Sequence, residues 1–398
     1  MASGPVVQSV DGLPARFLPE RARGMDTRFR LRIGSLVRDV IVADGACSVD
    51  KPSEAQVTTI STAPSTWLDM DAGRLSGIEA FATRRLSIRG SIQESLLFEP
   101  LFDRPDAGGL RYRVEDVVYG NHRMSTVVAG SDDLPPLVML HGLGGTKASL
   151  LPIVPGLTER FKVFVPDLPG FGASTKPRGR YDAPWFAEHV SAWMDELGIE
   201  QAHFVGNSMG GRITQEFGLR YPERVAAMAL LCPATAFSYR PGLRLVRLLR
   251  PELGLAVGYL PRRRIQIAMK TLFSKPSRIE ASWFEAAADD FLRTWRSPRA
   301  RMAFFASLRN IYLDEPYGES GFFTRVAALQ PPAYYIYGRR DTLISPNFAK
   351  KMAKVLPDAR VELWEDCGHT PQLEFPARTA DRLVEFFGRK AARAAVAG

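Results

Sequence analysis

A serine flanked by glycines constrains this chain more than any other feature of its 398 residues. Residues 206–211 read Gly-Asn-Ser-Met-Gly-Gly, between the apolar run 202–205 and a helix-like run that Pro222 ends. A serine on a sharp turn between a strand and a helix needs small neighbours, because the backbone is strained and the helix packs closely. Such a turn lifts the hydroxyl clear of the sheet and directs helix N-terminal amides at it. The pattern predicts that Ser208 is a nucleophile; a helix-capping serine is the alternative.

Two residues in the C-terminal part of the chain have the chemistry to activate this serine. Asp341 follows the tyrosine-rich run 333–337, and His369 follows the strand-like run 361–364. Both therefore come after a predicted strand, at the edge where open parallel sheets place their ligands. In the chain order Ser, Asp, His, the histidine accepts the proton of Ser208, and Asp341 orients the imidazole and stabilises the imidazolium.

A fourth part of the predicted site binds the developing negative charge on the substrate oxygen. The strand-like run 136–140 ends in His-Gly-Leu-Gly-Gly at 141–145, a flexible loop whose amides can approach a ligand. We expect the backbone amides of Met209 and Leu143 to form this oxyanion hole, in which the loss of one donor typically costs about 10²–10³ in rate. A further strand-like run leads into Asp-Leu-Pro-Gly-Phe-Gly at 167–172.

These five landmarks occur in one order, and residues from about 111 to 390 closely resemble the α/β-hydrolase family. The resemblance implies an α/β-hydrolase sheet, with a core at 111–232 and 327–390, and a C-terminal tail at 391–398. The intervening residues 233–326 are expected to form the helical cap that this family usually inserts over the nucleophile.

Other residues near the predicted site are weaker candidates. Asp366 lies close enough to His369 to compete as the acid, but a tight turn before a histidine is usually structural. Cys367 lacks the strand-to-helix turn that a nucleophile needs, and His141 is interpreted as structural because the triad is already complete. His122, His189 and His203 stand in no motif. The spacing of His and Cys predicts no metal site, and no cofactor is expected. Three scattered cysteines imply no disulfide framework.

The first hundred residues show a different pattern. Residues 28–33 alternate between apolar residues and arginines, 40–45 read as a strand entering a turn, and 55–61 as another strand. Short helices and a strand at 86–90 follow, and Ser91 to Phe102 carries an apolar helical stripe. Strands followed by small helices predict an α+β unit. We place this domain at 26–104, after an N-terminal extension at 1–25 and before a linker at 105–110.

This segment resembles the sterol-carrier-protein (type 2) lipid-binding family. The residues that carry the resemblance are Asp44-Gly45, the strand 58–61, Trp67-Leu68, Gly73, Ala80-Phe81 and the strand 86–90. The family usually has a longer helix before its first strand, where this chain offers little more than 15–23. The resemblance implies an apolar cavity for acyl chains or sterols, lined by Trp67, Phe81, Ile92, Leu96 and Phe98. A small structural core is the alternative, and for any single one of these residues it is preferred.

Composition and charge limit the kinds of partner that this protein is expected to bind. The net charge is +9, and the predicted cap carries an amphipathic run at 243–250 and Arg262-Arg263-Arg264. Such a cap can contact an anionic membrane surface; a solvated arginine-rich face is the simpler interpretation. No nucleic-acid recognition motif and no nucleotide-binding loop occurs. Without a signal-peptide pattern or a span of transmembrane length, a cytoplasmic enzyme is expected. The sequence does not determine the oligomeric state.

The sequence therefore predicts a serine hydrolase that cleaves a hydrophobic ester or thioester through an acyl-enzyme on Ser208. Three alternatives remain. The run 206–211 resembles that of carbon–carbon hydrolases of the meta-cleavage-product type, although those usually carry a longer glycine run where this chain has Leu143. Perhydrolysis uses the same triad. A non-enzymatic lipid carrier would use the hydrolase domain only as a scaffold.

Overall fold

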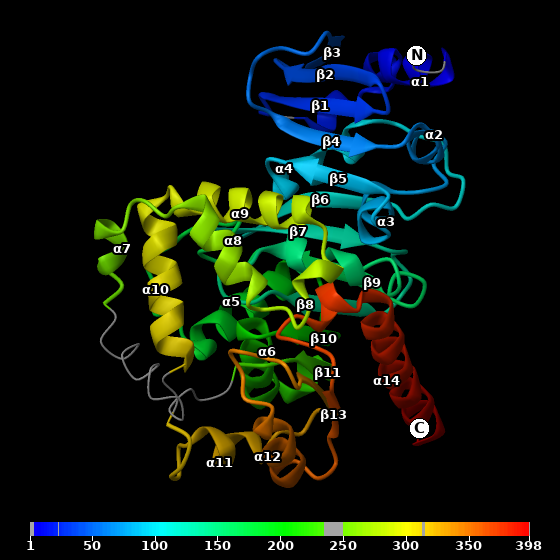
Figure 1. Cartoon of the computed structure of the whole chain (residues 1–398). Coiled ribbons are helices and arrows are strands. Elements are labelled where there is room, and N and C mark those ends of the chain that lie inside the picture. Colours follow the sequence, from blue (N-terminus) through cyan, green and yellow to red (C-terminus); the bar gives the residue numbers. More distant parts are fainter. Residues whose placement is uncertain (1–3, 23, 235–249, 313–314, 398) are drawn as a thin grey trace. The chain divides into compact units, whose positions relative to one another are not determined.

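The structure is a computed structural model that describes residues 4–22, 24–234, 250–312 and 315–397. The chain divides into two compact units (Figure 1). The first unit contains residues 1–114 and 280–290, and the second contains 115–279 and 291–398. The segment 280–290, expected to belong to the cap, therefore packs with the N-terminal residues. The predicted helix at 243–250 lies almost entirely outside the described residues.

The first unit is built on a five-stranded sheet. Its order is β3 (Ala46–Asp50), β2 (Leu36–Ala43), β1 (Thr27–Ile33), β4 (Thr58–Thr62) and β5 (Leu86–Arg89). Strand β1 pairs antiparallel with β2 and parallel with β4. The alternating pattern correctly predicted one buried face of β1, because Phe29, Leu31 and Ile33 are all buried. The turn after β2 needs positive φ at Asp44 and Gly45, which explains the residue types there. Strand β3 was not predicted.

The helices of this unit are α1 (Gly4–Asp11), α2 (Pro64–Asp71), α3 (Gly77–Ala82) and α4 (Ile92–Phe98). The stretch 15–23, which alone was expected to provide the family's first helix, forms in its described residues the 3₁₀ turns Leu13–Arg16 and Pro19–Arg21 and no α-helix. The N-terminal helix lies earlier, and it is part of the core because Val6 and Val10 are fully buried. The indole of Trp67 donates a hydrogen bond to Ser9 Oγ on this helix at 2.9 Å.

The residues expected to line a lipid cavity lie in the interior of this unit. Trp67, Ile92, Leu96 and Phe98 are buried and Phe81 is half-buried. The rings of Trp67 and Phe98 are 6.4 Å apart, and Phe29 contacts Phe98 edge-on at 5.3 Å. These contacts are those of an aromatic core. A role in lipid binding stays a prediction.

Asp290 fixes the start of α4. Its carboxylate accepts hydrogen bonds from Ser91 Oγ at 2.6 Å and from the amides of Ile92 and Gln93 at 3.1 and 3.3 Å. These amides belong to the first helical turn, where no partner within the helix is available. The aspartate is 6% exposed. A residue almost 200 positions along the chain therefore completes the fold of the first unit.

We expect Asp290→Ala to destabilise the first unit by about 2 kcal/mol, because it leaves buried donors facing an apolar side chain. Hydrogen–deuterium exchange of the α4 amides should accelerate by roughly 10- to 100-fold, since local opening becomes easier. Asp289→Ala, the neighbouring aspartate, is the control and should change exchange in α4 little. Equal exchange in both variants and the wild type would show that the capping contacts carry no stability.

The second unit is built on a mixed eight-stranded sheet. Its order is β13 (Arg360–Trp364), β12 (Ala333–Gly338), β11 (Val225–Leu231), β10 (Ala202–Asn207), β8 (Pro136–Leu140), β9 (Lys162–Pro166), β7 (His122–Ala129) and β6 (Tyr112–Tyr119). The strands from β13 to β9 run parallel, and β7 pairs antiparallel with β9. The central residues of β8, β9 and β11 are apolar without alternation, as expected where helices cover both faces of a parallel sheet. The predicted functional residues follow β8, β10, β12 and β13.

The second unit also contains the helices that accompany this sheet: α5 (Ala183–Glu196), α6 (Met209–Arg220), α12 (Asn347–Val355), α13 (Pro371–Glu374) and α14 (Pro376–Ala397). The insertion after β11 is helical, as predicted. Its described elements are α7 (Leu253–Ala256), α8 (Arg262–Lys270), α9 (Ala281–Trp295), α10 (Pro298–Tyr312) and α11 (Phe322–Val326). Within the described part of the chain, no helix combines the length and apolarity that crossing a bilayer would require.

Candidate active site

Ser208 occupies the sharp turn between β10 and α6. Its φ of 53° and ψ of −114° are strained for a residue with a side chain. The strain is held by backbone hydrogen bonds on both sides: the Ser208 amide donates to Leu231 at 3.0 Å, and its carbonyl accepts from Arg212 and Ala234. The side chain of Ser208 is 5% exposed. The local structure that the sequence predicted around this residue is confirmed.

Two glycines make this turn possible. A Cβ atom on Gly206 would lie 2.5 Å from the carbonyl oxygen of Gly210, and one on Gly210 would lie 2.1 Å from that of Leu140. Neither contact leaves space for a side chain. A Cβ on Gly142 would lie 3.2 Å from Ser208 Cβ, so the loop after β8 passes directly beside the serine.

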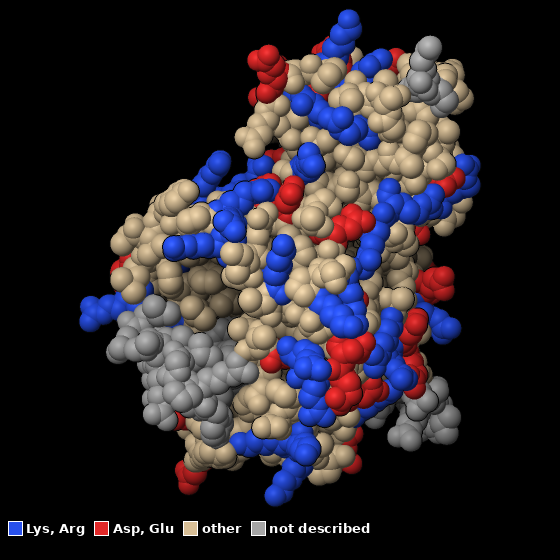
Figure 2. Space-filling view, in the orientation of Figure 1, with Lys and Arg blue, Asp and Glu red and all other residues tan. Residues whose placement is uncertain are grey.

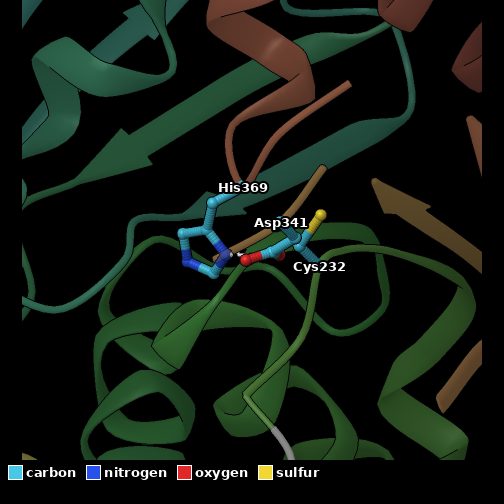
Figure 3. Close-up of side chains that lie close together, drawn as sticks. All are labelled: Cys232, Asp341 and His369. Carbon is cyan, nitrogen blue, oxygen red and sulfur yellow. Dashed lines mark hydrogen bonds and ion pairs between the residues drawn. The ribbon is translucent and has the colours of Figure 1, made fainter. Parts of the chain in front are cut away.

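His369 and Asp341 meet although 28 residues separate them (Figure 3). The distance from His369 Nδ1 to Asp341 Oδ2 is 2.8 Å, and both side chains are buried. The other carboxylate oxygen, Oδ1, accepts the amides of Leu343 and Ile344 at 2.7 and 2.9 Å. The carboxylate is therefore fixed in the orientation that receives an Nδ1–H group and leaves Nε2 for proton transfer.

Asp366, the competing acid, points elsewhere. It is half exposed and forms ion pairs with Arg278 at 3.3 Å and Arg378 at 3.6 Å. The hydrogen bond to the His369 ring comes from Asp341.

Two buried cysteines flank the His–Asp pair. The ligand atoms of Cys232, Asp341 and His369 lie within 4.8 Å of one another, and this is the one such group in the described residues that could hold a metal ion. Burial raises the pKa of the Cys232 and Cys367 thiols well above the usual range, so both stay protonated at neutral pH. A protonated, fully buried Cys367 does not act as a nucleophile.

The loop that carries His369 is held by residues that sequence reasoning missed. Glu374 Oε1 accepts the amides of Gly368 at 2.7 Å and Ser274 at 2.9 Å. Asn207, the residue before the serine, donates to the His369 carbonyl at 3.2 Å and to Leu231 at 3.0 Å. His369 is thereby attached to the turn that presents Ser208. Nothing in the sequence marks a glutamate five residues after the histidine as buried.

The loop expected to form the oxyanion hole is fixed by His141. The amide of Leu168 donates to His141 Nε2 at 3.0 Å, so Nδ1 carries the proton and donates to the Gly142 carbonyl at 2.8 Å. Burial lowers the pKa of His141, which keeps the ring neutral as this pattern requires. These contacts agree with the structural role assigned to His141.

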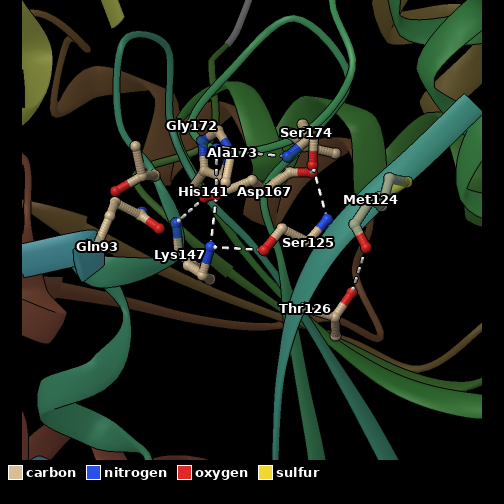
Figure 4. Close-up of polar contacts among 12 residues, drawn as sticks. Gln93, Met124, Ser125, Thr126, His141, Lys147, Asp167, Gly172, Ala173 and Ser174 are labelled. Atoms are coloured by element: carbon tan, nitrogen blue, oxygen red, sulfur yellow. Dashed lines mark hydrogen bonds and ion pairs between the residues drawn. The ribbon is translucent and has the colours of Figure 1, made fainter. Parts of the chain in front are cut away.

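A buried ion pair lies below the same loop (Figure 4). Lys147 Nζ is 2.6 Å from Asp167 Oδ2 and 3.2 Å from Ser125 Oγ, and the Lys147 amide donates to Asp167 Oδ1 at 2.7 Å. The amide of Ala173 also donates a hydrogen bond to Asp167 Oδ2 at 2.8 Å. Burial alone would raise the pKa of Asp167, but the Lys147 charge and these hydrogen bonds lower it overall. The carboxylate thus joins the loop at 141–147 to the turn at 167–173.

A small aromatic cavity opens beside this loop in the second unit. Its lining residues are Gly144, Gly145, Thr146, Phe171, Phe291, Thr294, Trp295, Ala300 and Phe304. A Cβ on Gly144 would approach the rings of Phe304 and Phe291 to 3.0 and 3.2 Å, and its φ of +69° also favours glycine. An apolar cavity with a few polar groups is the usual form of a small-molecule binding site.

Two of the remaining histidines, His189 and His203, have structural surroundings. His189 contacts Tyr119 Oη at 3.0 Å, and His203 packs between Phe161 and Phe387. Burial lowers the pKa of each to about 4. Both are neutral, partly buried residues at physiological pH.

The comparisons with known proteins identify both parts of the chain. Residues 135–376 match the model of the alpha/beta hydrolase fold, and residues 18–103 match that of the SCP-2 sterol transfer family. The chain belongs to the α/β-hydrolase family. Both resemblances inferred from the sequence are confirmed, and so is the fold class. The SCP-2 match begins at residue 18, eight residues before the predicted domain start.

Several of the similar proteins are hydrolases, and these are of two kinds. A pimeloyl-[acyl-carrier protein] methyl ester esterase of Aeromonas hydrophila is 29% identical over 67% of this chain and all of that protein. A 2-hydroxymuconate semialdehyde hydrolase of Pseudomonas sp. is 28% identical over 65% of this chain and 89% of that protein. Among solved structures, a bacterial membrane phospholipase A is 27% identical, with a TM-score of 0.59 over 70% of this chain and 87% of that one. This α/β-hydrolase is therefore an enzyme that hydrolyses ester or carbon–carbon bonds.

Proposed function

We propose that this enzyme is a serine hydrolase that cleaves an ester or thioester with a hydrophobic acyl group. The observation that carries the proposal is the hydrogen bond between buried His369 and Asp341, held next to the strained turn of Ser208. The aromatic cavity beside the loop of Leu143 supports a hydrophobic substrate.

The reaction proceeds in two half-reactions. Ser208 attacks the carbonyl carbon while His369 Nε2 takes its proton, and the amides of Met209 and Leu143 stabilise the negative oxygen. The imidazolium then protonates the leaving alcohol or thiol, and an acyl-enzyme remains. Water, deprotonated by the same histidine, releases the acid and restores the serine. Asp341 stabilises the imidazolium in both halves.

The N-terminal unit extends the proposal to lipids. Its match to the SCP-2 sterol transfer family supports a lipid-like ligand, and its interior holds aromatic rings around Trp67 and Phe98. We infer that the N-terminal unit binds the hydrophobic substrate or product of the hydrolase unit. The substrates of this enzyme are then esters whose acyl chain fits the aromatic cavity beside the Leu143 loop.

A series of p-nitrophenyl esters of increasing chain length tests this function. We expect kcat/KM to rise with chain length until the acyl chain fills the aromatic cavity, because each buried methylene contributes about 0.8 kcal/mol. Phe304→Ala, which enlarges the cavity, should move the optimum to longer esters. Phe305→Ala is the matched control, because Phe305 lies next in the chain but does not line the cavity.

The second candidate is hydrolysis of a carbon–carbon bond. Similarity to 2-hydroxymuconate semialdehyde hydrolase and to a 2-hydroxy-6-oxo-6-phenylhexa-2,4-dienoate hydrolase from Rhodococcus (25% identical, TM-score 0.57, 70% of this chain and 99% of that one) favours it. Turnover of a vinylogous diketone with slow cleavage of every ester would replace the ester proposal. An absence of turnover on both substrate classes would favour the lipid-carrier alternative.

A further inference from the structure

The cap presents an unusual combination of charge and apolar surface. Residues 233–326 contain 16 Lys and Arg against 8 Asp and Glu, so this insertion accounts for +8 of the net charge of +9. In the described stretch 250–279 the excess is stronger, with seven basic residues and one acidic residue. Figure 2 shows blue side chains set apart on a mostly tan surface over the cap helices.

Exposed apolar residues gather in the same stretch. Seven large apolar side chains are exposed in the described chain, and four of them fall within 15 residues: Leu253, Leu255, Tyr259 and Ile267. Tyr259 is 82% exposed. Helix α8 buries none of its nine residues, although Ile265, Ile267 and Met269 are apolar. A solvated face that served only solubility would not concentrate such residues.

Along the chain, exposed basic residues alternate with the exposed apolar ones in this stretch. Arg262, Arg263 and Arg264 are exposed at the start of α8, and Lys270 is exposed at its end. We define the cap patch as Leu253, Leu255, Tyr259, Arg262–Arg264 and Ile267. Cations beside exposed leucine, isoleucine and tyrosine match the boundary between phosphate head groups and acyl chains.

We propose that the cap patch docks on an anionic lipid bilayer. The arginines contact lipid phosphates, and Tyr259, Leu255 and Ile267 enter the interfacial region. The alternation of charge with apolar side chains favours a bilayer over an acidic protein, for which the arginines alone would suffice. This inference goes beyond the proposed reaction, because it identifies the lipid bilayer as the place where the enzyme encounters its hydrophobic ester.

Co-sedimentation of the full-length protein with vesicles tests the proposal. We expect binding to vesicles of phosphatidylcholine with 30% phosphatidylglycerol (roughly the anionic fraction that polybasic segments recognise), weak binding to pure phosphatidylcholine, and weakening in high salt. Replacing Arg262, Arg263 and Arg264 by glutamine should lower the partition coefficient on the order of 100-fold. Tyr259→Ser with Ile267→Ser should lower it by roughly tenfold.

The control replaces three exposed lysines outside the patch, Lys51, Lys350 and Lys354, by glutamine, which removes the same charge. It should retain most of the binding. All variants should hydrolyse a water-soluble short ester at the wild-type rate, which separates docking from the reaction. The proposal would be overturned if the lysine control lost as much vesicle binding as the arginine variant, or if the protein showed no preference for anionic vesicles. Binding to an acidic protein without vesicle binding would also overturn it.

Discussion

Ser208→Ala is expected to lower kcat for an ester substrate by about 10⁶-fold and to abolish labelling by a fluorophosphonate probe, because no other group replaces the attacking oxygen. The buried thiols do not substitute for it, since burial raises the pKa of both Cys232 and Cys367 and removes their thiolate forms. Stopped assays and gel fluorescence of the probe measure both effects. The fold should be unaffected, because an alanine can occupy the same turn.

A pair of aspartate variants provides the matched control. Asp341→Asn should lower kcat by about 10⁴-fold, because an amide stabilises the wrong histidine tautomer and does not stabilise the imidazolium. Asp366→Asn, three residues before His369, should change kcat less than threefold, roughly as for a surface ion pair. The assigned triad would be disproved if the probe labelled Ser208→Ala as strongly as the wild type. It would also be disproved if Asp366→Asn lowered kcat more than Asp341→Asn.

Lys147→Met is expected to destabilise the second unit by about 3–5 kcal/mol, because it leaves the carboxylate of Asp167 buried without its cation. Lys147 is 1% and Asp167 0% exposed in the side chain, so water does not replace the lost partner. Urea denaturation followed by tryptophan fluorescence measures the change. Lys162→Met, which removes an ion pair with an exposed aspartate, is the control and should cost less than about 1 kcal/mol.

The pH dependence separates this mechanism from a packing defect. In the wild type the pKa of Asp167 is lowered by folding, so its contribution is present above pH about 4 and is lost as pH falls further. In Lys147→Met the same carboxyl is buried and unpaired, its pKa rises, and the folded state binds the proton more tightly. The deficit of Lys147→Met should therefore shrink as pH falls from 8 toward 5.

Adding Asp167→Asn to Lys147→Met should remove this pH dependence, because no buried charge remains to titrate. A deficit in Lys147→Met that stays constant with pH would show that the lost stability comes from packing alone. In the double variant, a loosened loop at 141–147 should also lower kcat more than it changes KM, since the oxyanion donors act in the transition state.

Sequence reasoning succeeded where function and local geometry demand the same residue types. Gly206 and Gly210 lie so close to adjacent backbone atoms that no side chain fits there. The turn around Ser208 could therefore be predicted from these two residue types. Asp341 and His369, which lie in hydrogen-bond contact, were predicted because each follows a parallel strand, and parallel strands bring their ends to one edge. Strand β1 was read from its alternation, because one of its faces is buried.

The errors have a common physical origin. Helix α1 is short, and tertiary contacts of Val6, Val10 and Ser9 stabilise it more than its own propensity does. The packing of 280–290 with the N-terminal residues was not predicted, because it depends on bonds such as those of Asp290 to residues almost 200 positions away. Local sequence patterns hold no information on such long-range contacts.

The sequence alone determined the class of reaction, the two families and the identity of the nucleophile candidate, because these depend on residue types at short spacings. The tertiary structure decided which aspartate reaches His369, which charged groups are buried and which residues form the cavity. Each of these depends on distances between segments far apart in the chain. The buried pair of Lys147 and Asp167 illustrates the limit: both residues are ordinary surface types, and only the folded core makes their charges essential.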